Sequence, residues 1–180
     1  NKEGLTPLLA ACRARDGAAA VKLLVAAGAR GDATDKLGRT ALHFACLGGN
    51  TVSARVLIRA GASISQKCNR RGATPAHYAA AFARVDVLRM LLAADVALVD
   101  ARDNLGRVPL HWCALSAHRE WAEGRCIDVG ELLLRNGAKP TARDKTGSTP
   151  AHVAARLGAT AFLDFLVDKA DLDLLDQRDN

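Results

Sequence analysis

The chain has 180 residues, of which 49% are hydrophobic and 4% aromatic, and its formal net charge is +6. This length and hydrophobic content suit one domain of ordinary size with a sizeable core. No apolar stretch approaches the roughly 18 residues of a membrane span, and the first residues show no signal-peptide pattern. The five cysteines are odd in number and lack a Cys-x-x-Cys motif. We therefore expect a cytoplasmic or nuclear location rather than a secreted disulfide framework.

One short phrase recurs along the whole chain. It reads Gly-Ala-Thr-Pro-Ala-His-Tyr-Ala-Ala from Gly72, and its variants open at Gly4, Gly38, Gly106 and Gly147. The steps between these glycines are 34, 34, 34 and 41 residues. A fixed period of this length is typical of a stacked repeat array.

Each unit is predicted to contain a turn, a short first helix, a longer second helix and an extended loop to the next unit. The Thr-Pro pair marks the start of the first helix, because threonine can cap an exposed N–H and proline loses no useful donor there. A glycine after the second helix allows a left-handed C-terminal cap. The predicted units are about 1–34, 35–68, 69–102, 103–143 and 144–180.

Two units depart from this pattern. The third ends in Ala93, Ala94 and Asp95 without the capping glycine, so its last turn is predicted to close differently. The fourth holds the only long insertion, at about 116–124, which accounts for the 41-residue step. The last residues, 171–180, repeat the register of 95–104. We therefore expect the chain to be a monomeric piece of a longer array or of a larger protein.

The Thr-Pro-x-His phrase, combined with a second apolar run that a Gly-Ala pair closes, resembles the ankyrin repeat. The resemblance covers essentially the whole chain. It implies an all-α solenoid of stacked helix-turn-helix units with hairpin loops, forming a single domain over 1–180. Because no unit can bury both of its helices alone, stacking should form the core. The resemblance also implies a non-catalytic protein-interaction module rather than an enzyme.

Four histidines occupy the same position in their units, which invites a metal or acid–base interpretation. Equivalent positions in adjacent helices lie about 8–10 Å apart, whereas the ligands of one zinc ion lie about 2 Å from it. We instead expect each histidine to hydrogen-bond the turn at the start of its first helix. The four are His43, His77, His111 and His152.

A second group with metal-ligating side chains surrounds the insertion, namely Cys113, His118, Glu123 and Cys126. Its spacing matches no recognised zinc finger, and Cys113 falls at a position where other units carry a small core residue. No phosphate-binding loop, nucleophile elbow or His-Glu-x-x-His helix occurs. We therefore predict no catalytic residues, no metal site and no cofactor.

In proteins of the resembled family the partner usually meets the hairpin tips and the exposed side of the first helices. Here these positions carry many cations, which stacking should align into a basic stripe. Guanidinium groups pair bidentately with carboxylate or phosphate, so the expected partner is an acidic or phosphorylated protein. The nearby Asp35, Asp103 and Asp144 are expected to accept local backbone hydrogen bonds. The predicted partner-binding residues are Lys36, Arg39, Lys67, Arg70, Arg71, Phe82, Arg102, Arg107, Leu115, Trp121, Arg143 and Lys145.

Several alternatives stay open. Trp112 is expected in the core, whereas Trp121 lies in the insertion and is either an exposed anchor or a cover for the helix ends. The basic groove also suits a small anionic ligand, such as a nucleotide or an inositol phosphate, or an anionic membrane surface. The scarcity of aromatic residues argues against nucleotide stacking. Nucleic acid is not an expected partner, because no nucleic-acid fold signature accompanies the positive charge.

Overall fold

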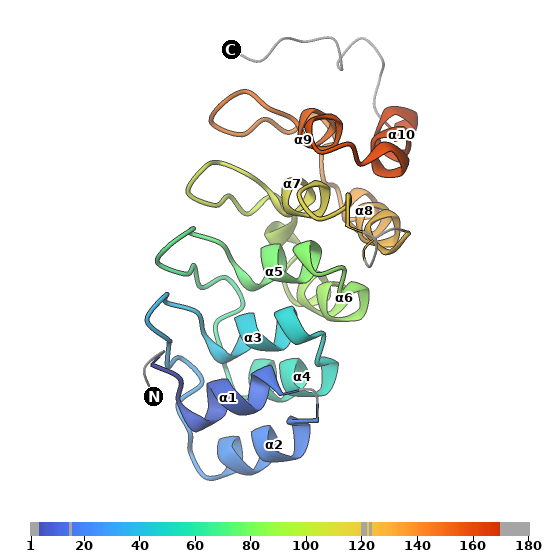
Figure 1. Cartoon of the computed structure of the whole chain (residues 1–180). Helices are drawn as coiled ribbons and strands as arrows, with labels where there is room; N and C mark the ends of the chain where they lie inside the picture. Colours follow the sequence, from blue (N-terminus) through green and yellow to red (C-terminus); the bar gives the residue numbers. More distant parts are fainter. Residues whose placement is uncertain (1–3, 15, 120–121, 123, 170–180) are drawn as a thin grey trace.

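The computed structural model describes residues 4–14, 16–119, 122 and 124–169. Over these ranges the chain is an all-α solenoid in which helix pairs stack along one axis and hairpin loops project to one side (Figure 1). The first helices of the pairs are α1 (Pro7–Arg13), α3 (Ala41–Gly48), α5 (Pro75–Ala81), α7 (Pro109–Ala114) and α9 (Pro150–Arg156). The second helices are α2 (Ala18–Ala26), α4 (Thr51–Arg59), α6 (Val85–Ala94), α8 (Arg125–Arg135) and α10 (Thr160–Lys169).

The helix boundaries follow the predicted signals. Thr6 accepts a hydrogen bond from the backbone N–H of Leu9 at the start of α1, and proline occupies the first position of that helix. Gly61, after α4, has a φ of +82°, as a left-handed cap requires. The second helix of the third unit ends differently, as predicted, because Asp95 caps a 3-10 helix that covers Val96–Asp100.

Within the described residues, three of the repeated histidines, His43, His77 and His111, each join two consecutive units. Nδ1 of His77 accepts a hydrogen bond from the backbone N–H of Thr74 at 3.2 Å, which confirms the predicted contact with the turn. Nε2 of the same ring donates to the carbonyl oxygen of Arg107, in the next hairpin, at 2.9 Å. His43 makes the equivalent bond to Ala73 at 3.0 Å. The sequence predicted the local bond but not this second bond, which fixes each hairpin to the preceding helix.

Burial governs the protonation of these rings. Desolvation lowers the pKa of His43 and His77 to about 4, although the bonded carbonyl oxygens oppose this shift. Desolvation also lowers the pKa of His111. The rings are therefore neutral near pH 7, with the proton on the nitrogen that faces the next unit.

The hairpin tips also bond directly to one another. The N–H of each tip donates to a carbonyl of the preceding tip at 2.8–2.9 Å. The pairs are Asn69 to Leu37, Asn104 to Arg71 and Lys145 to Leu105. Gly72 has a φ of +65°, and a Cβ there would collide with the side chain of Asn104. The tips thus form one continuous row whose spacing the backbone sets.

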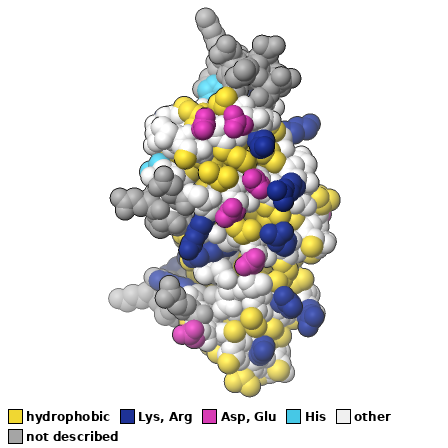
Figure 2. All heavy atoms as spheres, turned by 90° about the vertical axis from the view of Figure 1, so that its right-hand side faces the viewer, with side chains coloured by type: hydrophobic (Ala, Val, Ile, Leu, Met, Phe, Trp, Pro, Cys, Tyr) yellow, Lys and Arg dark blue, Asp and Glu magenta, His cyan; other side chains and the backbone are white. Residues whose placement is uncertain are grey.

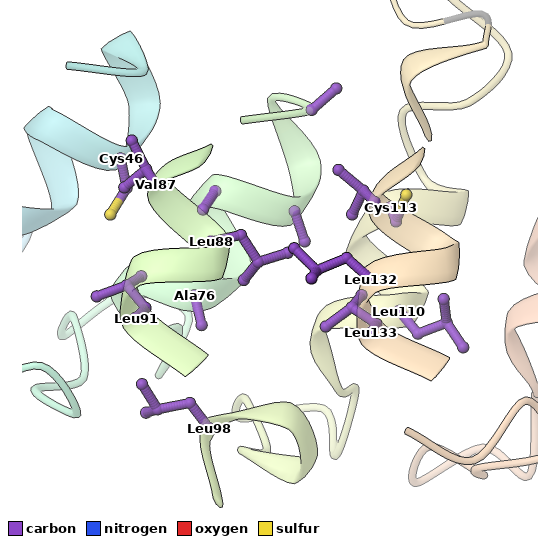
Figure 3. Packing of buried hydrophobic residues seen from close by; sticks show 14 of the residues in the cluster. Cys46, Ala76, Val87, Leu88, Leu91, Leu98, Leu110, Cys113, Leu132 and Leu133 are labelled. Atoms are coloured by element: carbon purple, nitrogen blue, oxygen red, sulfur yellow. The ribbon is translucent and has the colours of Figure 1, made fainter. Parts of the chain in front are cut away.

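The core lies between successive helix pairs, as stacking requires. Figure 3 shows Leu88 of α6 and Leu132 of α8 pointing toward each other across the space between two units. Leu88 and Leu133 are fully buried, and so are small residues such as Ala76 that let the helices approach closely. Truncating one such leucine to alanine costs about 2–5 kcal/mol of stability.

All five cysteines are buried, among them Cys113, which the repeat pattern placed at a position of small core residues. Burial raises the pKa of the Cys12 thiol to about 12, which suppresses its reactivity. The thiol of Cys113 donates to the carbonyl oxygen of Cys126 at 3.3 Å, so this pair links the ends of α7 and α8 beside the insertion. Ala122 of the insertion is fully buried. Within the described ranges, no helix combines the length and apolar character needed to cross a bilayer.

Candidate partner-binding surface

In the second and fourth hairpins an arginine forms an ion pair with an aspartate of the same hairpin. In the fourth, Nη2 of Arg107 lies 2.7 Å from Oδ2 of Asp103, and in the second, Arg39 lies 2.6 Å from Asp35. Oδ1 of each aspartate accepts two backbone N–H groups of its own hairpin, as predicted. The sequence prediction was incomplete, however, because Oδ2 neutralises a cation that the basic stripe was expected to present.

Asp103 is the centre of the fourth hairpin. Its Oδ2 also accepts a hydrogen bond from the indole N–H of Trp112 at 2.8 Å, and the residue is buried. Burial acts to raise the pKa of this carboxyl, but hydrogen bonds from Arg107 and Trp112 outweigh it and hold the pKa below its usual range. Asp103 therefore stays ionised at neutral pH and fixes both side chains.

The third hairpin has the same backbone form without this ion pair. Asn69 replaces the aspartate, and Ala73 stands where the other two hairpins have arginine. Arg70 and Arg71 occupy the tip, and both are exposed. Among the described residues, neither of them forms an ion pair. The third hairpin therefore presents two uncompensated guanidinium groups.

These two arginines border a pocket of about 600 Å³ between the third and fourth hairpins and the helices behind them. We name it the basic pocket. It brings together five of the predicted partner-binding residues: Arg70, Arg71, Phe82, Arg107 and Leu115. Its other lining residues are Ala81, Asn104, Leu105, Trp112, Ser116 and Arg119. None of the described lining residues is acidic.

The wall of the basic pocket combines cations with an aromatic surface. The guanidinium carbons of Arg71 and Arg107 each lie 5.5 Å from the centre of the Trp112 ring, within the range of cation–π attraction. Trp112 is 4% exposed, which confirms its predicted place in the core. The pocket can therefore hold an anionic group beside apolar atoms, with Arg70, Arg71 and Arg119 supplying the charge.

A smaller pocket of about 410 Å³ lies beside the second hairpin and likewise combines cations with an aromatic ring. It contains the predicted residues Lys36 and Arg39, together with Phe44. The guanidinium of Arg39 lies 4.6 Å from the centre of the Phe44 ring while it is paired with Asp35. Because that pairing removes the charge of Arg39, this pocket is less basic than the one beside the third hairpin.

Four of the remaining predicted residues, Lys67, Arg102, Arg143 and Lys145, line neither pocket. Arg102 donates hydrogen bonds to the carbonyl oxygens of Gly106 and Arg143. Arg143 donates to the carbonyl oxygen of Gly147. These two arginines therefore stabilise the hairpin backbone. Lys67 and Lys145 are exposed and line neither pocket. Trp121 lies outside the described residues.

Sequence reasoning missed Arg119 and Ser116 as members of the basic pocket, and it left Asn104 out of the predicted partner-binding residues. Asn104 occupies a tip position and could have been included from the repeat register alone. Ser116 and Arg119 lie in the insertion, where the register no longer says which way a side chain points. The other prediction around the insertion, that its cysteines and histidine hold no metal, concerns a group that includes Glu123, which is outside the described residues. Among those described, no cluster of three or more histidine, cysteine or acidic side chains is placed to hold a metal ion.

Comparison with known families agrees with this architecture. A family model described as ankyrin repeats (3 copies) matches residues 1–68, and one described as ankyrin repeats (many copies) matches residues 76–123. A model of the single ankyrin repeat matches residues 105–145 and 146–177. No curated protein matches the chain.

Proposed function

The chain belongs to the ankyrin repeat family, and from this premise we propose that it is a non-catalytic module whose basic pocket binds an acidic or phosphorylated segment of a partner protein. Ankyrin repeats are generally protein–protein interaction modules. The choice of an acidic or phosphorylated ligand rests on the third hairpin. There Arg70 and Arg71 line the pocket, and none of its described lining residues is acidic.

Charge and rigidity support this choice of partner. Free guanidinium groups bind carboxylate or phosphate through two parallel hydrogen bonds. Arg107 is already paired with Asp103, so Arg70 and Arg71 are the better candidates for this interaction. Hydrogen bonds between tips and from the histidines hold the hairpins in place before a partner arrives. A preorganised surface loses little conformational freedom on binding. We place the module in the cytoplasm or the nucleus.

The test uses one peptide sequence in three labelled forms that carry serine, glutamate or phosphoserine at the same positions. Fluorescence anisotropy compares the wild-type chain with an Arg70→Glu/Arg71→Glu variant. We expect the phosphoserine and glutamate forms to bind, and the variant to weaken this binding by about tenfold or more, or about 1.4 kcal/mol. The serine form should bind weakly to both proteins.

The matched control is an Arg55→Glu/Arg89→Glu variant, whose substitutions lie on the second helices, away from the hairpins. Both double variants lower the formal net charge from +6 by four, to +2. Equal weakening by the two variants would show that binding follows total charge, and it would refute a role for the pocket.

A small anionic ligand is the second candidate, and the size of the basic pocket favours it. A volume of about 600 Å³ lies within the usual range of roughly 300–1,000 Å³ for small-molecule sites. Calorimetry with inositol hexakisphosphate and with ATP tests this alternative. Heat of binding that disappears in the Arg70→Glu/Arg71→Glu variant would support it, and a flat response would leave the peptide as the ligand.

A further inference from the structure

A third hollow lies on the opposite side of the solenoid from these two pockets, between α4 and α6. Figure 2 shows this side, where hydrophobic side chains gather in patches between the second helices and charged side chains surround them. The hollow has a volume of about 670 Å³, and we name it the outer groove. Its lining residues are Thr51, Arg55, Ile58, Arg59, Asp86, Arg89, Met90, Ala93 and Ala94.

We propose that the outer groove binds an acidic amphipathic helix of a partner protein. This surface is separate from the basic pocket, because it shares no lining residue with it and is built from second helices rather than from hairpins. The proposal therefore does not depend on the ligand of the hairpin side.

Helical spacing creates the floor of the outer groove. On α6, Met90, Ala93 and Ala94 follow one another at intervals that place them on one face of the helix. Ile58 lines the groove from the side of α4. Ala93 is aligned with Arg59 of α4 at the 34-residue period of the array, and this small residue leaves the groove open on the α6 side.

The rim of the groove is basic. Arg55, Arg59 and Arg89 are exposed, and Asp86 is the single acidic residue among the described residues that line the groove. Among the described residues, none of these three arginines forms an ion pair. On α8, by contrast, Arg135 pairs with Glu131 at 3.0 Å. Three cations and one anion leave the groove a net charge of +2, which favours an acidic ligand.

The rim belongs to a gradient of charge along the outer helices. One exposed or half-exposed position stands two residues before the central leucine of each second helix, and its charge changes sign along the solenoid. In chain order this column reads Lys22, Arg55, Arg89, Glu131 and Asp164. The groove lies in the basic part of the column, which favours an acidic partner there.

A helix suits the shape of this groove. Two neighbouring helices leave a channel into which a third can pack at an axial distance of about 8–10 Å. An amphipathic helix presents apolar anchors at i, i+3, i+4 and i+7, and these match the floor of Ile58, Met90 and Ala93. The flexible side chain of Met90 adapts to the shape of such anchors. Acidic residues on either side of the anchors then reach the arginines of the rim.

The probe for this proposal is a labelled peptide of about 18 residues, or about five helical turns, with leucine on one face and glutamate elsewhere. A scrambled peptide of the same composition is the control for the ligand. We expect the amphipathic peptide to bind the wild-type chain and to become helical by circular dichroism. We expect an Arg55→Glu/Arg89→Glu variant to bind it about tenfold or more weakly, and clearly more weakly than an Arg70→Glu/Arg71→Glu variant of the same net charge does.

An Ala93→Arg variant separates shape from charge. The substitution copies the residue at the aligned position of α4, so the fold should tolerate it, and it raises the net charge by one. We expect weaker binding because the new side chain occupies the groove. Tighter binding, equal binding of the scrambled peptide, or absence of binding to the wild type would overturn the proposal. So would a wild-type dimer in sedimentation that Ala93→Arg dissociates, because a second copy would then be the occupant.

Discussion

The third and fourth hairpins share one backbone form but use their arginines in opposite ways. In the fourth, Asp103 pairs with Arg107 and binds Trp112, so the charge is satisfied within the loop. In the third, Asn69 and Ala73 replace both partners of the ion pair, and Arg70 and Arg71 stay available at the tip. The comparison shows that a cation is available to a partner only where no carboxylate of the same loop is paired with it.

Removing the central carboxylate should expose the largest difference between the two hairpins. We expect Asp103→Ala to lower the free energy of unfolding by about 3–5 kcal/mol, because it leaves Arg107 without its buried partner. Asn69→Ala, at the aligned and exposed position of the third hairpin, should cost less than about 0.5 kcal/mol. Urea unfolding followed by circular dichroism measures both. Equal losses would show that the ion pair does not distinguish the two loops.

Acidification should loosen both hairpins together, since each is fixed by an equivalent histidine. The pKa of His43 and of His77 is about 4 in the folded chain, against about 6.5 when unfolded. Below pH 6.5 the unfolded chain therefore binds protons that the folded chain does not. The free energy of unfolding should fall by up to about 1.4 kcal/mol per pH unit for each histidine until about pH 4, and should be fully recovered above pH 6.5.

Urea midpoints measured between about pH 7 and pH 4 test this prediction. A His77→Asn variant is the control, because it removes one of the titrating rings and should flatten the curve. An unchanged pH dependence in this variant would show that other groups, such as paired carboxylates, govern the acid response.

Placing an acid in the third hairpin should make it resemble the fourth. In an Asn69→Asp variant the new carboxylate stands beside Arg70 and Arg71, where it competes with an acidic ligand. We expect the affinity for the phosphoserine peptide to fall about fivefold, or about 1 kcal/mol. The free energy of unfolding should stay the same or rise slightly, because Asp35 and Asp103 accept two backbone N–H groups at this position. An unchanged affinity would argue against the third hairpin as the binding element.

Salt should produce the smallest effect, and it should act on only one of the two hairpins. Raising the ionic strength from about 0.1 M to about 1 M shortens the Debye length from about 10 Å to about 3 Å. Peptide binding at the exposed Arg70 and Arg71 should weaken by a few-fold. The buried pair of Asp103 and Arg107 is screened much less, so the unfolding midpoint should change little. Anisotropy and urea titrations at both salt concentrations make the comparison.

The fold could be read from the sequence because its signals are local and repeated. Thr-Pro starts, glycine ends and the histidine contact with the turn depend on residues a few positions apart, and these predictions are confirmed. The missing glycine after Ala94 likewise predicted the altered turn at Asp95. The bond from His77 to Arg107 was missed because it joins different units.

The candidate site was harder to predict because it depends on which charges meet. The repeat register correctly placed Arg39 and Arg107 in the hairpins, and the backbone bonds of Asp35 and Asp103 were predicted. The ion pairs between these aspartates and arginines were evident only from the geometry. Arg119 lines the pocket but lies in the insertion, whose side chains the repeat register does not place. The outer groove was not predicted, because its lining includes the small residues Ala93 and Ala94, and alanines on an exposed helix face are no signal of a binding site in a sequence.

The change of sign along the outer helices gives the solenoid an electric dipole parallel to its long axis. The amino-terminal pairs carry Lys22, Arg55 and Arg89, and the later pairs carry Glu131 and Asp164. In the field of an approaching charged protein, such a dipole experiences a torque as well as an attraction. This torque would orient the long axis of the solenoid relative to the charged protein before the two surfaces touch. The order of the units along the chain therefore also sets which end of the solenoid faces a charged partner first.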